Sequence, residues 1–269
     1  MDVRKLSRVY ESQLMPNWEG RFAPFLLESF PQDIPAKSTL LEMGCTTGRF
    51  TTEIVSRMPE ASRLIAVEDV RELMEQARLK IPPEKKKKVF FKKERPDSLS
   101  FADETFDGVF SGGLATIYEM RKVLEEAARL LKKDGFLLIG TALKGSFQEL
   151  LDVFREVLEK EDLIAAQDRL DEFCERFPDR IRANRMLANA GIVESRVRNQ
   201  EMSIHFKDGL DLMASALVRR YCLEECLGLI KDRGWREGVL AGMIRALDTY
   251  FPDGMELTVV MGRLEGSKL

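Results

Sequence analysis

The chain has 269 residues, of which 44% are hydrophobic and 32% are charged, and its formal net charge is −3. This length and hydrophobic fraction allow one large domain, or one domain with a substantial insertion, around a hydrophobic core. The nearly balanced charge argues against a nucleic-acid partner, because proteins that bind nucleic acid carry a basic excess. No apolar run reaches the eighteen residues or so that a membrane span requires, so we expect no membrane contact.

Cysteine usage and the first residues bear on metal binding and compartment. The four cysteines are Cys45, Cys174, Cys222 and Cys226. Only the last two are close, at helical spacing, and no second Cys or His pair accompanies them, so we expect free thiols and no metal site. Residues 1–12 are charged and lack the apolar core of a signal peptide. Together with the free thiols, this predicts a cytoplasmic protein.

Residues 1–37 have apolar side chains at helical spacing, and Pro16 and Pro24 divide them into two short predicted helices. After them, short apolar runs alternate with helical segments. Such alternation predicts a parallel sheet covered by helices on both faces. Strands are predicted at residues 38–43, 63–68, 88–92, 105–112 and 136–141, and helices at residues 49–58, 71–80 and 117–131.

The second half of the chain is mainly helical in pattern. Gly191 is expected to end one of these helices. The single histidine, His205, falls on a predicted strand, where we expect a structural residue rather than a catalytic base. Helices are predicted at residues 146–176, 181–190, 208–230 and 238–250, and strands at residues 196–205 and 256–263.

The most informative segment reads Leu-Leu-Glu-Met-Gly-Cys-Thr-Thr-Gly-Arg-Phe, from residue 40 to residue 50. An apolar run ends in an acid, two glycines follow four residues apart, and a helix begins after them. This is a strand, a tight turn and a helix, the first unit of a nucleotide-binding α/β fold. Glycine has no Cβ, so the turn lets a ligand lie against the main chain. The candidate ligand-binding residues of this turn are Glu42, Gly44, Cys45, Thr46 and Gly48.

Two further acids, Glu68 and Asp69, close the second predicted strand about twenty residues beyond the turn. A carboxylate accepts two hydroxyl donors at once, which suits a ribose. Glu68 is the expected ribose ligand, and Asp69 is the adjacent alternative. The other interpretation is an acid that stabilises the N-terminus of the following helix through its dipole.

The glycine turn resembles motif I of the class I S-adenosylmethionine (SAM) methyltransferases, although Thr46 stands where many members carry a third glycine. The resemblance extends over about residues 38–141. Leu-Ser-Phe at residues 99–101 and Phe-Asp at residues 106–107 align with the family's approach to strand four. Ala-Arg-Leu-Leu-Lys-Lys-Asp-Gly at residues 128–135 is similar to the family's turn into strand five.

The resemblance implies where the rest of the cofactor lies. Asp97, Ser98 and Leu99 are expected near the adenine, with Arg95 standing where the family often has an acid. Residues 111–114, which begin with Ser111 and Gly112, are expected near the transferred methyl group. This region lacks the Asn/Asp-Pro-Pro-Tyr/Phe sequence of many amine methyltransferases, which argues against base methylation of nucleic acid. The sequence does not indicate a catalytic residue.

The resemblance also implies a fold and a domain organisation. We expect an α/β, Rossmann-like, seven-stranded, mostly parallel sheet with an antiparallel last strand and helices on both faces. Residues 1–37 would form N-terminal helices, and residues 38–269 a methyltransferase-like domain with a helical lid at about 145–178. The layout looks like that of the malonyl-carrier-protein O-methyltransferases.

These expectations favour a SAM-dependent methyltransferase (EC 2.1.1.-) that acts on a small molecule or a carrier-bound acyl group. A basic cluster at residues 85–93 would suit an acidic protein partner. The alternative is a catalytically inactive methyltransferase-like subunit that binds a protein partner, an interpretation motivated by Thr46 and Arg95. A nicotinamide dehydrogenase is disfavoured, because the turn lacks the third glycine of the dinucleotide fingerprint.

Overall fold

A computed structural model of the protein describes residues 8–112 and 119–269. The chain forms two compact units. The first unit comprises Met1–Thr141, Arg180–Asn199 and Gly262–Leu269, and the second comprises Ala142–Asp179 and Gln200–Met261. All of the predicted cofactor-binding residues belong to the first unit.

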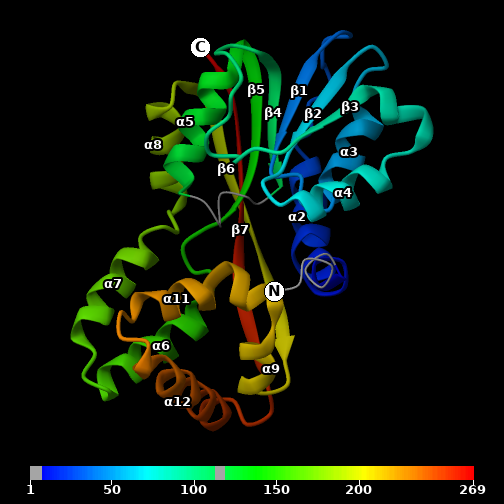
Figure 1. Ribbon diagram of the computed structural model, residues 1–269. Coiled ribbons are helices and arrows are strands. Elements are labelled where there is room, and N and C mark those ends of the chain that lie inside the picture. The colour runs from blue at the N-terminus through cyan, green and yellow to red at the C-terminus, as the bar shows by residue number, and fades with distance from the viewer. Residues whose placement is uncertain (1–7, 113–118) are drawn as a thin grey trace. The chain divides into compact units, whose positions relative to one another are not determined.

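The central sheet has seven strands in the order β3-β2-β1-β4-β5-β7-β6. The first five strands are parallel where they pair, and the β5, β7 and β6 edge is antiparallel. The predicted Rossmann-like sheet is therefore confirmed (Figure 1). The strands are β1 (Thr39–Met43), β2 (Arg63–Val67), β3 (Val89–Lys92), β4 (Phe106–Gly112), β5 (Leu131–Ala142), β6 (Ile192–Phe206) and β7 (Met255–Lys268).

The strand order reverses between β1 and β4, and this reversal fixes which face each helix covers. Right-handed crossovers put the helices that follow β1 and β2 on one face and the helix that follows β4 on the other. Such a reversal leaves a crevice beyond the carboxyl ends of the central strands, where ligands of this fold class bind. The crossover helices are α3 (Arg49–Arg57), α4 (Arg71–Lys80), η2 (Pro83–Lys88) and α5 (Met120–Leu130), and α8 (Arg180–Asn189) packs beside α5.

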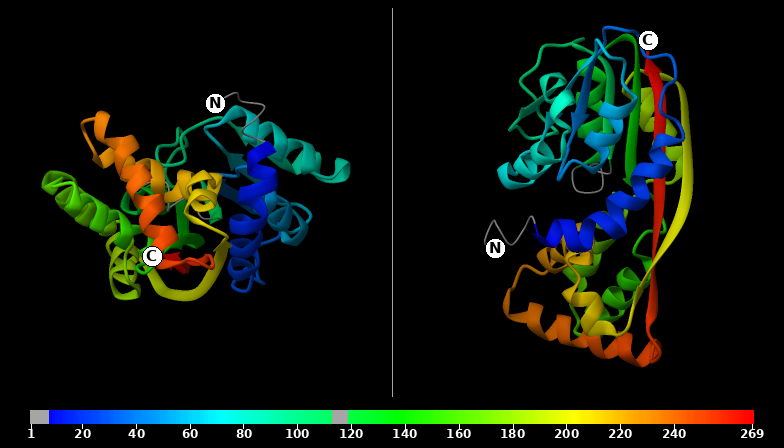
Figure 2. Two further views of the ribbon diagram at one scale, coloured as in Figure 1. Left: turned by 90° about the horizontal axis from the view of Figure 1, so that it is seen from below. Right: turned by 90° about the vertical axis from the view of Figure 1, so that its right-hand side faces the viewer.

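The N-terminal segment of the first unit is a π-helix, η1 (Tyr10–Glu19), which runs directly into α2 (Gly20–Leu27) (Figure 2). Pro16 and Pro24 lie inside these helices and do not interrupt them, contrary to the sequence-based expectation. Proline lacks an N–H donor, and the wider π-helical turn around Pro16 accommodates the missing bond. The buried face of this segment includes Tyr10, Leu14 and Trp18.

Helices α2 and α3 pack on the sheet through a shared hydrophobic core. Phe110 of β4 is its centre, stacked on Phe30 at 5.3 Å between ring centroids and meeting Phe50 edge-on at 6.1 Å. Leu26, Ile54 and other fully buried side chains complete the layer. Because α3 follows the glycine turn directly, this packing also fixes the position of the turn.

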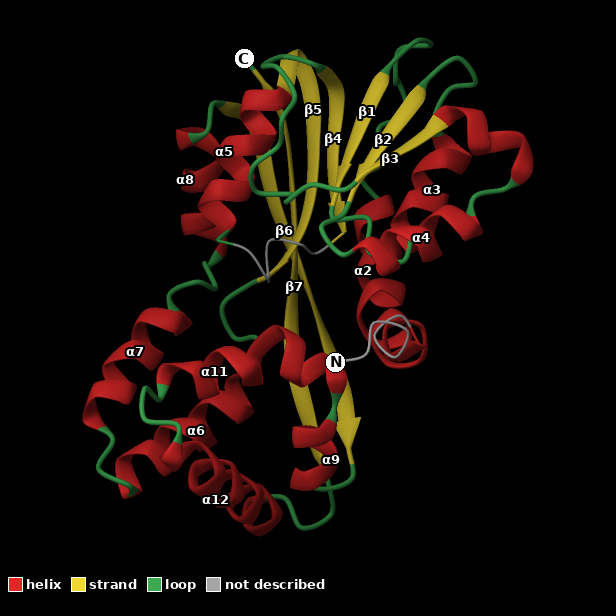
Figure 3. Ribbon diagram, viewed as in Figure 1, coloured by secondary structure: helices red, strands yellow, loops and turns green. Residues whose placement is uncertain are grey.

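The second unit is mainly helical apart from its portions of β6 and β7 (Figure 3). The long helix predicted at residues 208–230 is wrong, because the chain breaks at Ser215. Asp208 caps a first short helix through the Asp211 N–H, and Ser215 is extended (ψ 124°) and caps the next helix through the Val218 N–H. The helices are α6 (Gln148–Lys160), α7 (Ile164–Cys174), α9 (Gly209–Ala214), α10 (Ala216–Val218), η4 (Arg219–Leu223), α11 (Glu224–Leu229) and α12 (Gly234–Tyr250).

No helix among the described residues has the length and apolarity needed to span a membrane.

Candidate cofactor site

The turn between β1 and α3 has three residues in the left-handed backbone region. Gly44 has φ 76°, Thr46 has φ 46° and Gly48 has φ 86°. The N–H groups of Gly44 and Cys45 both donate to the Val67 carbonyl at 2.9 Å, which ties the turn to the end of β2. Left-handed conformations suit glycine, and they shape a tight turn at the carboxyl end of β1 in which Gly44, Cys45 and Gly48 are buried.

Gly48 is needed for space as well as for conformation. A Cβ at this position would lie 2.7 Å from the Cα of Ala77 in α4, closer than real Cβ atoms approach. The glycine therefore allows α3 and α4 to approach each other beneath the turn. The sequence pattern predicted this residue as part of the ligand-binding loop, and the structure gives it this packing role.

Thr46, which departs from the glycine-rich pattern, is held in its left-handed conformation by two carboxylates. Its hydroxyl donates to Glu19 Oε1 at 2.6 Å, and its N–H donates to Glu68 Oε2 at 3.0 Å. Left-handed backbone is uncommon for a β-branched residue and persists where the surroundings determine it. The two hydrogen bonds supply this determination, so a non-glycine residue fits the turn.

Glu42 is buried at the end of β1, 1% exposed, and its Oε2 atom has no hydrogen-bond partner among the described residues. Burial, together with the charges of Glu19 and Glu68, raises the pKa of Glu42 to about 8 against the lowering effect of a hydrogen bond with Thr51. An unsatisfied buried carboxylate is costly unless a donor or a cation meets it. The position therefore suits a positively charged ligand group.

Glu68 follows β2 and is 3% exposed. Its Oε1 accepts from the Val70 N–H at 3.0 Å, and its Oε2 accepts from the Thr46 N–H. Burial and a hydrogen bond with Asp69 together raise the pKa of Glu68 to about 8. Glu68 thus ties the turn after β1 to the start of α4, and the ribose roles of Glu68 and Asp69 stay predictions.

The predicted adenine segment follows β3. Asp97 forms a bidentate ion pair with Arg95, with Nε to Oδ1 at 3.0 Å and Nη2 to Oδ2 at 2.8 Å. The Ser98 N–H closes a turn onto the Arg95 carbonyl. Leu99 is buried, and its N–H donates to Glu126 Oε1 at 2.6 Å. The Asp97 carboxylate is therefore engaged by Arg95, and the adenine contacts stay predictions.

Ser111 and Gly112 end β4, at the same edge of the parallel sheet as the glycine turn. Ser111 is fully buried, and no described residue forms a hydrogen bond with its hydroxyl. A Cβ at Gly112 would lie 3.4 Å from Phe50, the second residue of α3. Gly113 and Leu114, expected near the methyl group, lie outside the described residues.

The comparisons with known proteins agree with this geometry. The family described as a methyltransferase domain matches residues 41–139, which run from the end of β1 into β5. The match covers 99 of the 269 residues. The resemblance to class I SAM-dependent methyltransferases is thereby confirmed. No curated protein matches the chain.

Solved structures show the same fold at low sequence identity. The YcgJ protein from Bacillus subtilis is 17% identical with a TM-score of 0.57, covering 93% of this chain and 98% of that one. Geranyl diphosphate C-methyltransferase from Streptomyces coelicolor, bound to S-adenosyl-L-homocysteine (SAH), is 13% identical with a TM-score of 0.53, covering 92% and 79%. A methyltransferase from Haloferax volcanii in complex with its Trm112 activator is 16% identical with a TM-score of 0.52, covering 97% and 94%.

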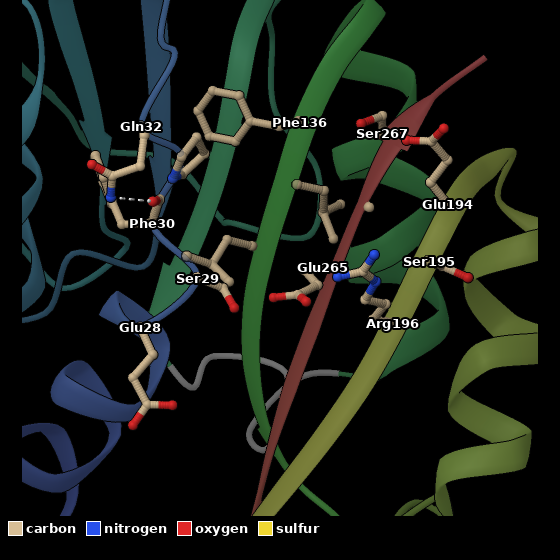
Figure 4. A pocket seen from close by; sticks show the side chains of 14 residues that line it. Glu28, Ser29, Phe30, Gln32, Phe136, Glu194, Ser195, Arg196, Glu265 and Ser267 are labelled. Atoms are coloured by element: carbon tan, nitrogen blue, oxygen red, sulfur yellow. Dashed lines mark hydrogen bonds between the residues drawn. The ribbon is translucent and has the colours of Figure 1, made fainter.

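A second concave site in the first unit shares no residue with the cofactor turn. It has a volume of about 790 Å³ and is lined by the loop after α2 and by β5, β6 and β7 (Figure 4). Phe136 gives it an apolar wall, and Glu28, Glu194, Arg196 and Glu265 make it polar. No sequence motif indicated this pocket, because its walls come from four segments far apart in the chain.

The lysine-rich stretch of η2 and β3 lies at one edge of the sheet of the methyltransferase domain. Lys85 and Lys88 both pair with Glu60, and Lys92 pairs with Glu94 at 2.8 Å. These two carboxylates balance part of the basic charge of the cluster, and the acidic protein partner stays a prediction.

Three of the four cysteines, Cys45, Cys222 and Cys226, are buried. Burial raises the pKa of the Cys45 thiol well above its ordinary value, so it stays protonated and is a poor nucleophile. Cys222 and Cys226 are buried with their sulfur atoms 3.7 Å apart. The described residues contain no group of three or more His, Cys, Asp or Glu side chains that could hold a metal ion.

Proposed function

We propose that this chain is a SAM-dependent methyltransferase whose acceptor is a small molecule or a carrier-bound acyl group. The observation that carries the proposal is the left-handed turn at Gly44, Thr46 and Gly48 beside the buried Glu42 carboxyl group, whose Oε2 atom has no hydrogen-bond partner among the described residues. Glycines in the turn would let a ligand lie against the main chain, and the Glu42 carboxyl group would suit the cationic methionine end of SAM. The residues present therefore fit the cofactor.

When bound, SAM supplies an electrophilic methyl group on a positively charged sulfur. The residues of the chain would hold and orient it. Glu42 would face the cationic end, and the backbone at Gly44 and Cys45 would lie against the cofactor. Glu68 would accept from the ribose with the lone pairs that Thr46 and Val70 leave free. Ser111 would face the transferred methyl group from the end of β4.

The acceptor class depends on whether the site must supply a general base to activate the acceptor. Methyl transfer is an in-line displacement, so proximity and alignment account for most of the rate enhancement. A carboxylate acceptor is already nucleophilic and needs no general base. An acyl group with a free carboxylate is therefore the acceptor we expect.

A coupled assay of SAH formation tests this proposal. The purified chain is incubated with SAM and with free carboxylic acids, carrier-bound dicarboxylic acyl groups, alcohols or amines. We expect turnover with a carboxylate acceptor, and loss of turnover in a Gly44→Val variant. Turnover with amines alone would overturn the expectation of a carboxylate acceptor. SAM binding without turnover on any acceptor would favour the inactive-subunit alternative.

A further inference from the structure

The pocket drawn in Figure 4 lies wholly within the first unit. Its lining comes from the loop after α2 and from β5, β6 and β7, whereas the cofactor turn follows β1. The volume of about 790 Å³ falls within the range of small-molecule sites. The pocket is therefore large enough for a ligand of its own, and the groups in its wall indicate which kind.

One wall of the pocket is apolar and is fixed by packing. The Phe136 ring lies over Gly108, where a Cβ would come within 2.2 Å of it, and meets Phe110 edge-on at 5.2 Å. Phe30, from the loop after α2, is 5% exposed and stacks on Phe110 at 5.3 Å. These contacts hold the wall in place without a ligand, so it is preorganised for an apolar group.

The acids of the pocket are only partly neutralised. Arg263, which is buried in β7, pairs with Glu28 at 2.8 Å, but its Nε lies 3.6 Å from Glu265 Oε2. Neither that Nε nor that Oε2 has a hydrogen-bond partner among the described residues. Glu194 of β6 adds an exposed carboxylate, and no described residue forms an ion pair with it. One buried cation thus faces an excess of carboxylates, which favours a positively charged ligand group.

A cation without a partner lines the same pocket. Arg196 of β6 is exposed, and its guanidinium forms no ion pair within the described part of the chain. Figure 4 shows Arg196 and Glu194 extending from β6 over β7, and Glu265 extending from β7 toward β5. A guanidinium presents a planar fork of donors that matches a carboxylate. Free groups of both signs therefore meet beside the apolar wall.

We propose that this pocket binds an α-amino acid with an apolar side chain. Such a molecule carries a carboxylate, an ammonium and an apolar group on one carbon atom. Arg196 binds the carboxylate, Glu194 and Glu265 face the ammonium, and the side chain lies against Phe136. A simple amine or a simple acid would leave one of the two charges unused. The inference does not rest on the proposed function, because no residue of the cofactor turn takes part.

NMR titration of four small molecules onto the isotope-labelled chain tests the proposal. The probes are L-phenylalanine, phenethylamine (no carboxylate), phenylpropanoate (no ammonium) and glycine (no apolar side chain). We expect L-phenylalanine to bind in the millimolar range and to shift the amide signals of Ser195 and Gly266, which line the pocket. The other three should bind at least about five-fold more weakly. Shifts at Gly44 and Gly48 instead would place the amino acid at the cofactor turn and overturn the proposal.

Arg196→Gln is the decisive variant, because an exposed side chain without a partner can be replaced without loss of folding. The Kd for L-phenylalanine should rise at least about five-fold, whereas binding of phenethylamine should not change. The matched control is Arg198→Gln, at an exposed position on the same strand but outside the pocket, which should leave both constants unchanged. Equal binding of L-phenylalanine to the wild type and to Arg196→Gln would overturn the proposal, as would no binding to the wild type.

Discussion

Replacing Gly48 with alanine is expected to lower the free energy of unfolding by about 3 kcal/mol and to abolish SAM binding. The new methyl group would have to occupy space 2.7 Å from the Ala77 Cα, which is backbone and cannot rotate away. It would also force a side chain into φ 86°. Helix α4 would shift away from α3, and the turn between Gly44 and Gly48 would lose its shape.

Urea denaturation and SAM titration measure the two effects, and Gly191→Ala is the matched control. Gly191 also has a left-handed backbone (φ 81°), but nothing lies within 4 Å of the position that a Cβ would take. Its substitution should cost about 1 kcal/mol of conformational strain and leave SAM binding unchanged. An equal loss of stability in the two variants would show that Gly48 is not required for the close packing of α3 against α4.

The stability of the ligand-free protein is expected to fall as the pH rises from 5.5 to 8.5, and Glu42→Gln should remove part of this fall. The pKa of Glu42 is about 8 in the folded protein and 4.5 in the unfolded chain. Between these values the folded state holds a proton that the unfolded state releases, so raising the pH favours unfolding. The stabilising contribution is complete below pH 4.5 and is lost as the pH passes through 8.

Glutamine is uncharged at every pH and has nearly the shape of protonated glutamate. Between pH 5.5 and pH 8.5 the wild type should lose about 3 kcal/mol of stability that the Glu42→Gln variant keeps, as measured by urea denaturation without SAM. Glu84→Gln, at an exposed position on η2, should follow the wild-type curve. Parallel curves for wild type and Glu42→Gln would show that Glu42 does not carry the pH dependence.

Much of the methyltransferase domain could be predicted from the sequence, because its signals are local. The apolar run before Glu42, the glycines four residues apart and the acid at residue 68 all lie within short segments. Alternation of strands and helices then fixes a parallel sheet, since right-handed crossovers leave few topologies. The conformation of Thr46 could not be predicted in this way, because it depends on Glu19, 27 residues earlier in the chain.

Three other features could not be predicted from the sequence, and two of them depend on contacts between distant segments. The continuity of η1 and α2 through Pro16 and Pro24 is set by packing of the buried face of these helices, which outweighs the local preference of proline. The break at Ser215 has a local cause, a serine cap, but helical periodicity on both sides of it masked the signal. The pocket lined by β5, β6 and β7 joins four separate segments, and no single segment carries a recognisable pattern.

The central claim is that the turn between β1 and α3 holds SAM. Isothermal titration of SAM onto the wild-type chain and onto Gly44→Val tests it most directly. Valine is β-branched and strongly disfavours the φ of 76° that Gly44 adopts. We expect micromolar binding to the wild type and none to a variant that circular dichroism shows to be folded. Absence of binding to the wild type, or equal binding to both proteins, would contradict it.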